Sequence, residues 1–286
     1  MITVIRVLAV LFVFFCAVSQ AEEGKCDRLV SLAPSLTQIL VELGLKSNLV
    51  GVTRYDISPA EVASLPRVGG LLDPNYEAIF ALSPSQVLLL HEHGPIAEQL
   101  ARLGIESFAL DHRTIKGIIE SVTKIGELCS SQSQAQSVVS RLELAVTAAE
   151  TRASKFPKVK ALVVIGGSTE EGLKNLFISG RDGFYNDLLR IAGGENMYQQ
   201  STASFGSISA EGLLALDPEV IIHIRPNYDG LTATPDDALR IWSELSSLRA
   251  VKNKRVYVLS DVEVTIPGIT FPGVLGKFED ILHPKI

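Results

Sequence analysis

The sequence has no run of lysines or arginines, and its formal net charge is −6 with a pI near 5.5. A protein that binds nucleic acid needs a basic face, so this charge balance argues against such a partner. Low-complexity tracts are also absent, and 47% of the 286 residues are apolar. The chain is therefore expected to be globular and to fold as one large domain or two ordinary ones.

Long apolar runs are missing as well. The apolar run at residues 7–18 is too short to span a bilayer as a helix, and small residues follow it at 19 and 21. This pattern predicts a signal peptide, residues 1–21, whose removal leaves Glu22 as the first residue. An uncleaved membrane anchor is the alternative. A lipoprotein signal is not expected, because Phe15 stands where a small residue would precede Cys16.

Cysteine is scarce, and the mature chain keeps only Cys26 and Cys129. In an oxidising compartment these two residues can pair. The bridge would close a loop of about 100 residues and stabilise the fold by roughly 4–5 kcal/mol in the chain-entropy model. Two separately buried thiols are the alternative, and spacing alone does not decide between them.

Glycine and proline are both absent between Gly126 and Pro157. Apolar residues at 138, 142, 145 and 149 fall on one helical face there, which predicts a helix over 132–155. At 1.5 Å per residue such a helix is about 36 Å long. It either packs along a single domain or joins two domains.

Short apolar strands alternate with helical patterns on both sides of this segment. The predicted strands are 28–32, 49–53, 87–90, 106–110, 160–165, 219–224 and 255–259. This alternation predicts an α/β fold with parallel sheets that helices cover on both faces.

One helix–turn–strand pattern occurs twice, as NYEAIFALSPSQVLLL (75–90) and SAEGLLALDPEVIIHI (209–224). At a constant offset of 134 residues the two segments share a glutamate, an Ala-Leu pair and a proline. The repeat favours two similar α/β lobes joined by the long helix, with a cleft between them.

Each copy of the repeat carries one acid in its first helical turn. Asn75 and Ser209 are good N-cap residues, which assigns Glu77 and Glu211 to those turns. The helix dipole alone favours a glutamate there. Two equivalent acids, one on each lobe, also suit docking onto a two-fold partner that presents arginines.

Several motifs follow one another in order: RLVSLAPSLTQIL, VGVT, PRVGGLLDPNYEAIFALSPSQVLLL, LGIESFALD, ISG, LLRIAGGEN and SAEGLLALDPEVII. With them the chain, from about Arg28 to Pro284, resembles the substrate-binding proteins of ABC importers for iron complexes and vitamin B12. The resemblance implies a periplasmic protein with two lobes, a rigid connecting helix and a ligand between the lobes. It also implies that Glu77 and Glu211 pair with arginines of a permease dimer in the inner membrane.

The expected organisation is a signal peptide (1–21), an N-terminal α/β lobe (22–130), a connecting helix (131–156) and a C-terminal α/β lobe (157–286). In a parallel sheet, ligands bind off the carboxyl ends of the strands, so the residues directly after each strand are cleft candidates. The ligand-binding candidates are Arg54, Tyr55, Gly69, Gly70, His91, His93, Phe205, Arg225, Tyr228 and Asp261. By resemblance, Tyr55 and Phe205 occupy positions where aromatic residues of B12-binding members flank the ligand.

His91, Glu92 and His93 follow a predicted strand directly. In an extended segment residues 91 and 93 point to one side and residue 92 to the other, so only the two imidazoles would converge. They are weak candidates for a metal site, with a polar contact to the ligand and ordinary surface histidines as alternatives. His223 is expected to be a core histidine, because it lies inside a strand.

The ligand is expected to be a cobalt or iron chelate, and the resemblance favours a corrinoid such as vitamin B12. A ferric siderophore or haem is the alternative within the family, because Arg54 and Arg225 can bind an anionic ligand. A free metal ion, or a chelatase-like enzyme that uses Glu92 and its neighbours, is the alternative outside it. No enzyme activity is expected, because GxSxG, HExxH and P-loop motifs are absent. Neither a cofactor nor oligomerisation is expected.

Overall fold

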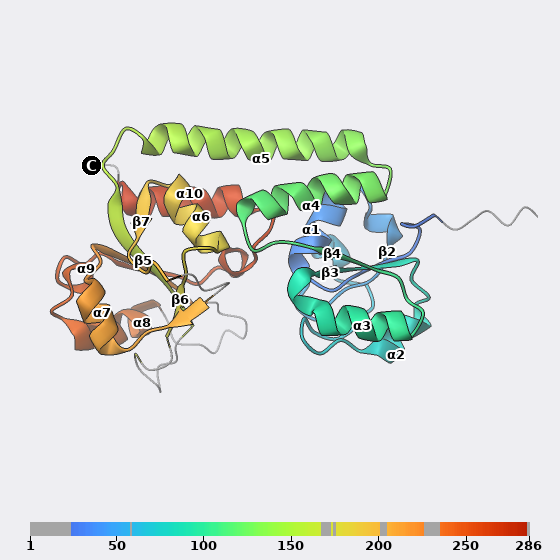
Figure 1. Cartoon of the computed structure of the whole chain (residues 1–286), viewed down its shortest axis with the longest axis horizontal. Helices are drawn as coiled ribbons and strands as arrows, with labels where there is room; N and C mark the ends of the chain where they lie inside the picture. The colour runs from blue at the N-terminus through green and yellow to red at the C-terminus, as the bar shows by residue number, and fades with distance from the viewer. Residues whose placement is uncertain are drawn as a thin grey trace, which may run out of the picture.

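The computed structural model describes residues 24–57, 59–166, 173, 176–200, 205–225 and 235–284, without the side chains of 235–238. Figure 1 shows two groups of strands and helices side by side, with one long helix, α5 (Gln132–Ala153), lying across both. This is the two-lobe α/β arrangement that the alternating pattern and the repeat predict. The predicted signal peptide lies outside the described residues.

The first lobe is built on a four-stranded parallel sheet in the order β2-β1-β3-β4. Its strands are β1 (Leu29–Ser31), β2 (Leu49–Gly51), β3 (Gln86–Leu90) and β4 (Ser107–Leu110). Its helices are α1 (Pro34–Glu42), α2 (Tyr76–Ala81), α3 (Gly94–Arg102) and α4 (Ile115–Leu128), with short 3₁₀ turns η1 (Lys46–Asn48), η2 (Ala60–Val62) and η3 (His91–His93). Every residue of β1 and β3 is buried, as expected for strands that helices cover on both faces.

The second lobe is built on a mixed sheet in the order β10-β9-β5-β6-β8, with β7 also paired to β5. Its strands are β5 (Val159–Ile165), β6 (Phe177–Ser179), β7 (Gly194–Asn196), β8 (Phe205–Ser207), β9 (Val220–Ile224) and β10 (Val256–Leu259). Its helices are α6 (Phe184–Ile191), α7 (Ala210–Leu216), α8 (Pro235–Trp242), α9 (Arg249–Lys252) and α10 (Phe271–Leu282), with 3₁₀ turns η4 (Ser243–Leu245) and η5 (Val262–Thr265).

The expectation of a purely parallel sheet holds for β5, β7, β9 and β10 and fails for β6 and β8. Strand β6 runs antiparallel to the end of β5, and β8 runs antiparallel to β6. An antiparallel neighbour needs no crossover helix, so the chain can turn back directly beyond β5. These two strands extend the sheet at the carboxyl end of β5.

The repeat in the sequence is also a repeat in the structure. Strands β3 and β9 keep the offset of 134 residues at both ends, and each follows a short helix, α2 or α7. Asn75 caps α2 by accepting a hydrogen bond from Ala78 N at 2.9 Å, and Ser209 caps α7 by accepting one from Gly212 N at 3.2 Å. The same local chemistry therefore begins both helices.

Both helices also end in the same way. Ser83 follows α2 with φ of 45°, and Asp217 follows α7 with φ of 41°. These residues are 134 positions apart and adopt the left-handed conformation that side chains seldom take. A proline follows each of them and prevents the helix from continuing.

A single hydrophobic cluster connects the lobes. It includes Leu36 in the first lobe, Ile118 of α4, Leu142 of α5, Leu188 of α6 and Phe278 of α10. The predicted apolar face of α5 is buried at positions 138, 142 and 149 and half-buried at 145. Helix α5 is therefore packed on both lobes along its length, which limits how far they can rotate apart.

The two cysteines form a disulfide. Cys26 precedes β1 and Cys129 ends α4, and their Cα atoms are 5.3 Å apart. The bridge joins residues separated by 103 positions and fixes the start of the described chain to the turn between α4 and α5. Of the two alternatives left open by the sequence, the structure has the disulfide.

Candidate ligand cleft and docking helices

A cavity lies between the two lobes, beside the segments that follow β3, β4 and β6 and the start of β8. Its volume is about 100 Å³, and residues of both lobes line it. The first lobe contributes Glu92, His112 and Arg113, and the second contributes Ser179, Gly183, Phe184, Tyr185, Phe205 and Pro267. Phe205, which begins β8, therefore lies near the segments after β3 and β4, whereas the other described ligand-binding candidates do not line this cavity.

A buried carboxylate shapes the loop that follows β2. Asp56 Oδ2 accepts hydrogen bonds from Thr53 N at 2.8 Å and from Thr53 Oγ1 at 2.5 Å. Arg67 Nη1 donates to the carbonyl oxygens of Thr53 and Asp56 at 3.1 and 3.0 Å. Burial raises the pKa of Asp56 above its ordinary value. These contacts hold a tight turn whose exposed members are Arg54 and Tyr55.

Arg54 is paired within its own lobe. Its guanidinium forms an ion pair with Asp73 and lies 5.6 Å from the centre of the Tyr55 ring. The pair occupies the space beside Gly70, where an added Cβ would meet Arg54 Nη2 at 2.6 Å. Gly69 has φ of +96° and an added Cβ there would be 2.6 Å from Asp73 O. The two glycines therefore allow the turn and the ion pair to form.

The segment His91–His93 is a 3₁₀ turn, so the expectation of an extended segment with converging imidazoles is wrong. His91 and Glu92 are exposed, whereas His93 is buried. His93 Nδ1 accepts a hydrogen bond from Leu90 N at 3.3 Å, and burial lowers its pKa. The two imidazoles diverge because a 3₁₀ turn advances about 120° per residue, unlike a strand. In the described part of the chain, no group of three or more acidic, histidine or cysteine side chains could hold a metal ion.

The segment after β4 links the two lobes directly. His112 is buried, and its Nδ1 lies 2.9 Å from Ser35 Oγ and 3.2 Å from the carbonyl oxygen of Pro267 in the second lobe. Burial lowers the pKa of His112 to about 4. Arg113 Nη2 contacts Asp111 Oδ2 at 2.6 Å and lowers the pKa of Asp111 to about 2. His112 is therefore a neutral contact between the lobes.

Arg225 is more deeply buried than Arg54 and Arg113, the ion-paired arginines of the first lobe. It follows β9 directly and is only 8% exposed. Its Nη1 atom has no hydrogen-bond partner among the described residues. Asp261, another sequence candidate, forms an ion pair with Lys277 of α10. Tyr228 lies outside the described residues.

Three exposed apolar residues in loops or a short strand were not among the candidates from the sequence. Phe177 begins β6 and pairs with Ile165 at the carboxyl end of β5. Ile57 and Leu72 belong to the two loops that the Arg54–Asp73 ion pair joins. A single apolar residue in a turn or short strand looks like a core residue in the sequence. Only the position of Leu72 just beyond the glycine pair in PRVGGLLD could have indicated it.

The expectation for His223 is confirmed. It is buried, with Nε2 at 2.7 Å from Gly166 O, and its Nδ1 accepts a hydrogen bond from Trp242 Nε1 at 3.2 Å. Trp242 is itself buried and packs edge-on against the imidazole. Both residues stabilise the core of the second lobe.

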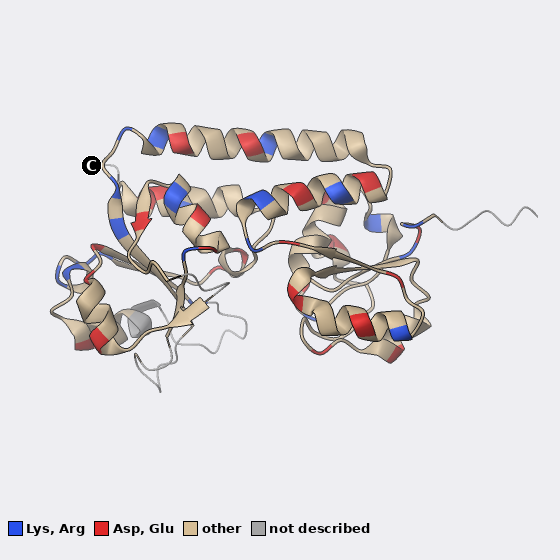
Figure 2. Cartoon of the chain, viewed as in Figure 1, with Lys and Arg blue, Asp and Glu red and all other residues tan. Residues whose placement is uncertain are grey.

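The two glutamates of the repeat are exposed in the first turns of α2 and α7. Figure 1 shows these helices in different lobes, both on the side of the molecule away from α5, and Figure 2 shows acidic colour on each. The carboxylate of Glu211 accepts hydrogen bonds from its own N–H and from Ser209, which lowers its pKa. Each lobe therefore has one exposed glutamate at the start of a short helix.

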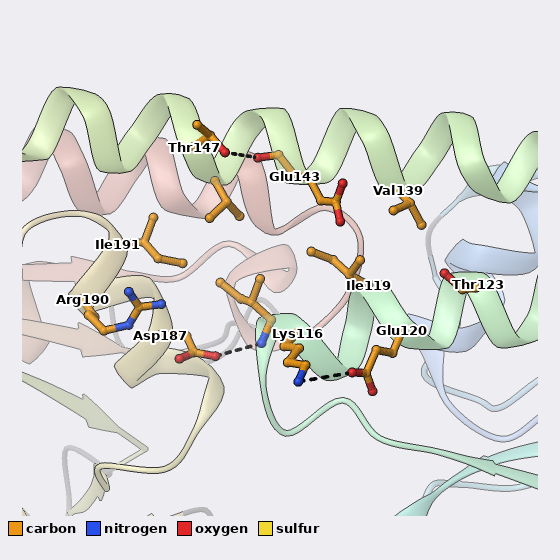
Figure 3. Close-up of a pocket in the computed structure, with 12 residues that line it drawn as sticks. Lys116, Ile119, Glu120, Thr123, Val139, Glu143, Thr147, Asp187, Arg190 and Ile191 are labelled. Carbon is orange, nitrogen blue, oxygen red and sulfur yellow. Dashed lines mark hydrogen bonds and ion pairs between the residues drawn. The ribbon is translucent and has the colours of Figure 1, made fainter.

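A groove of about 710 Å³ lies beneath α5, at the junction of α4, α5 and α6. Figure 3 shows Asp187 and Arg190 of α6 on one side and Lys116 and Glu120 of α4 on the other. Asp187 Oδ2 accepts a hydrogen bond from Ile115 N at 3.0 Å and so links α6 to the start of α4. The groove is formed by helices rather than strand ends, so we assign it to the junction and not to the ligand cleft.

Comparison with known proteins agrees with this architecture. The family described as periplasmic binding protein matches residues 29–262. The chain belongs to the periplasmic binding protein family. Among its described helices, none combines the length and apolar character needed to cross a bilayer.

Individual relatives include haem and vitamin B12 proteins. The high-affinity heme uptake system protein IsdE of Staphylococcus aureus is 27% identical over 276 residues, covering 90% of this chain and 88% of its own. A periplasmic heme binding protein from Pseudomonas aeruginosa has a TM-score of 0.77 at 25% identity, covering 91% of this chain and 93% of its own. The vitamin B12 binding protein BtuF of Vibrio cholerae has a TM-score of 0.74 at 20% identity, covering 90% and 96%, which supports the fold alone.

Proposed function

We propose that this protein binds haem between its lobes and delivers it to the permease of an ABC importer. Haem replaces the corrinoid as the favoured ligand, because the relatives at 25–27% identity are named as haem proteins. Cobalamin stays the second candidate, since the exposed rings of Tyr55 and Phe205 also suit the faces of a corrin. A ferric siderophore is a weaker third candidate.

Exposed apolar residues on both lobes suit the walls of a site for a flat, largely apolar ligand. Tyr55 and Leu72 lie in loops of the first lobe, and Phe177 and Phe205 lie on neighbouring antiparallel strands of the second. The register of these strands puts both phenylalanines on the same face of the sheet. Ligand pockets commonly combine such apolar walls with a few polar groups that fix orientation.

Arg225 is the main reason for proposing an anionic ligand. A buried guanidinium whose Nη1 has no partner among the described residues is costly unless an anion completes its hydrogen bonds. A haem propionate is a carboxylate and can accept that bond in charge-assisted form. Cobalamin has neutral amides and one phosphodiester, so it uses such a cation less fully.

Titration of the mature chain, residues 22–286, with hemin tests this proposal. We expect a Soret shift that saturates at one hemin per chain, and at least tenfold weaker binding for Arg225→Gln, since a hydrogen bond to a charged group contributes about 1.5–3 kcal/mol. Arg102→Gln, on the exposed face of α3, is the matched control and should bind normally. If hemin fails to bind and cyanocobalamin saturates the chain, the second candidate replaces the first.

Tyr55 and His91 are exposed side chains of types that ligate haem iron. Tyr55→Phe and His91→Gln keep the approximate shape of each residue and remove the iron-binding atom. Loss of the charge-transfer band of bound hemin in one variant would identify the ligand. Iron released from hemin on incubation would instead support the chelatase-like alternative.

Delivery is proposed to use Glu77 and Glu211 as the contacts to arginines of a permease dimer. The Glu77→Ala/Glu211→Ala double variant should bind hemin normally and fail to support uptake. Normal uptake by this variant would move docking to another surface. We further propose that the protein is a monomer, is exported by cleavage after Ala21 and lacks enzyme activity.

The proposed lobes are residues 22–130 and 157–286, with 131–156 as the connecting helix. Two hydrogen bonds link them directly, from Ile115 N to Asp187 and between His112 and Pro267 O. Gly268 also lies close to α1, where an added Cβ would meet Gln38 Oε1 at 2.8 Å. These contacts and the shared core support limited hinge closure around haem rather than a wide opening.

A further inference from the structure

Each helix proposed to dock on the permease presents an exposed apolar side chain beside its glutamate. Phe80 follows Glu77 by three residues and is 60% exposed, and Leu214 follows Glu211 by three residues and is 41% exposed. Residues three positions apart on a helix lie on the same face with Cβ atoms about 5–6 Å apart. Acid and apolar side chain therefore form one small surface on each lobe.

The two surfaces are equivalent in more than these two positions. From 74 to 82 and from 208 to 216 the order of exposed, half-buried and buried residues is identical at every position. Phe80 and Leu214 are themselves 134 residues apart, the offset of the repeat. A lone exposed apolar residue is common on proteins and indicates nothing. Two at equivalent positions, each beside an acid, point to one function carried out twice.

We infer that Phe80 and Leu214 are contacts to the permease dimer, which presents on each subunit an arginine beside an apolar pocket. This inference rests on the proposed docking role of Glu77 and Glu211. An exposed ion pair contributes little, because water screens it. Apolar contacts that exclude water around the pair strengthen it, as the surroundings of interface hot spots do.

The symmetry of the partner adds a condition. A two-fold dimer offers two identical pockets, so each pocket must accept either the phenyl ring of Phe80 or the smaller side chain of Leu214. The exchange variant Phe80→Leu/Leu214→Phe should therefore bind almost as well as the unaltered chain. Truncation of either side chain should instead weaken binding to the permease.

The test measures binding of the mature, hemin-loaded chain to the source organism's own haem permease in lipid nanodiscs. Phe80→Ser and Leu214→Ser should each weaken binding about tenfold, mainly through faster dissociation, and the exchange variant should stay within about twofold. Leu144→Ser is the matched control, because Leu144 is 70% exposed on α5, away from both docking helices. Circular dichroism melting and hemin titration of each variant verify that fold and ligand site are intact.

Three outcomes would overturn the inference, and the measurements distinguish them. If the serine variants bind normally while Glu77→Ala/Glu211→Ala does not, the glutamates dock without apolar contacts and only this inference fails. If the glutamate variant also binds normally, the proposed docking surface itself is wrong. A loss equal to that of the serine variants in Leu144→Ser would likewise contradict it, because the effect would not be specific to the docking helices.

Discussion

Helices α2 and α7 of the two lobes have the same kind of cap, the same burial pattern and a left-handed residue at equivalent positions after their ends. The loops at the strand ends differ. Arg54 of the first lobe is paired with Asp73, whereas the guanidinium of Arg225 in the second has an unpartnered Nη1 among the described residues. A symmetric partner requires two similar surfaces, and an asymmetric ligand requires two different walls. The difference between the lobes fits both demands.

The sheets of the two lobes also differ in their strand directions. The first lobe has a purely parallel sheet, and the second adds the antiparallel strands β6 and β8. This addition carries the exposed aromatic residues Phe177 and Phe205, which we propose as the second wall of the ligand site. The two lobes are thus alike around α2 and α7 and differ beside β5, where β6 and β8 are added.

The largest expected effect comes from the disulfide, which fastens only the first lobe. Replacing Cys26 and Cys129 by serine should lower the free energy of unfolding by about 4–5 kcal/mol, because the bridge closes a long loop in the unfolded chain. Urea unfolding followed by circular dichroism measures this loss, and the unaltered chain in reducing buffer is the control. A loss below about 1 kcal/mol would mean that the core alone determines stability.

The contact between the lobes should depend on pH. His112 has a folded pKa of about 4, below its ordinary 6.5, so the folded state resists protonation while the unfolded state accepts it. Stability is therefore lost as pH falls from 6.5 toward 4, by up to about 3 kcal/mol from this group. His112→Asn keeps a hydrogen-bonding atom near Pro267 and should reduce the slope of unfolding free energy against pH in that window.

His93 and His223 also have lowered pKa values, so part of the dependence should persist in His112→Asn. An unchanged slope in that variant would assign the whole effect to the other two histidines.

The equivalence of α2 and α7 can be tested through their caps. Asn75→Ala and Ser209→Ala each remove one capping hydrogen bond and should each cost about 1 kcal/mol of unfolding free energy. Because the two sites have the same geometry, the two losses should agree within about 0.5 kcal/mol. A loss in one lobe only would show that the repeat is similar in shape but not in energetics.

The smallest expected effect concerns the paired arginine. Asp73→Asn removes the negative charge beside Arg54 and leaves its guanidinium available for a second propionate. Hemin binding should then strengthen by a few fold, which corresponds to less than about 1 kcal/mol at an exposed site. Titration against Glu98→Gln, an exposed acid on α3, measures the change; weaker binding would mean that the ion pair itself shapes the cleft.

The sequence predicted the regular elements closely where the apolar pattern was long or repeated. Predicted strands 87–90, 219–224 and 160–165 correspond to β3, β9 and β5 within one residue at each end, and the helix predicted over 132–155 ends at Ala153. These segments are buried on a constant face, so their periodicity is strong. Strands β6 and β8 have three residues each, which is too few to establish a period.

The sequence could nominate positions for the candidate site but not the contacts that their side chains make. The strand-end rule nominated Arg54, Tyr55 and Arg225, whose role in ligand binding stays a prediction. It did not reveal that Arg54 is ion-paired whereas Arg225 Nη1 has no partner among the described residues. The direction of His93 was wrong because a single turn of 3₁₀ helix is set by tertiary contacts rather than by the sequence HEH. The disulfide was undecided for the same reason, because Cβ proximity is a property of the fold.

The most direct test of the central proposal is a structure of the mature chain with hemin. We predict the porphyrin between the loops carrying Tyr55 and Leu72 and the strands carrying Phe177 and Phe205, with a propionate oxygen within hydrogen-bond distance of Arg225 Nη1. Hemin bound in the groove beneath α5, or in the cleft with both propionates directed away from Arg225, would contradict this account.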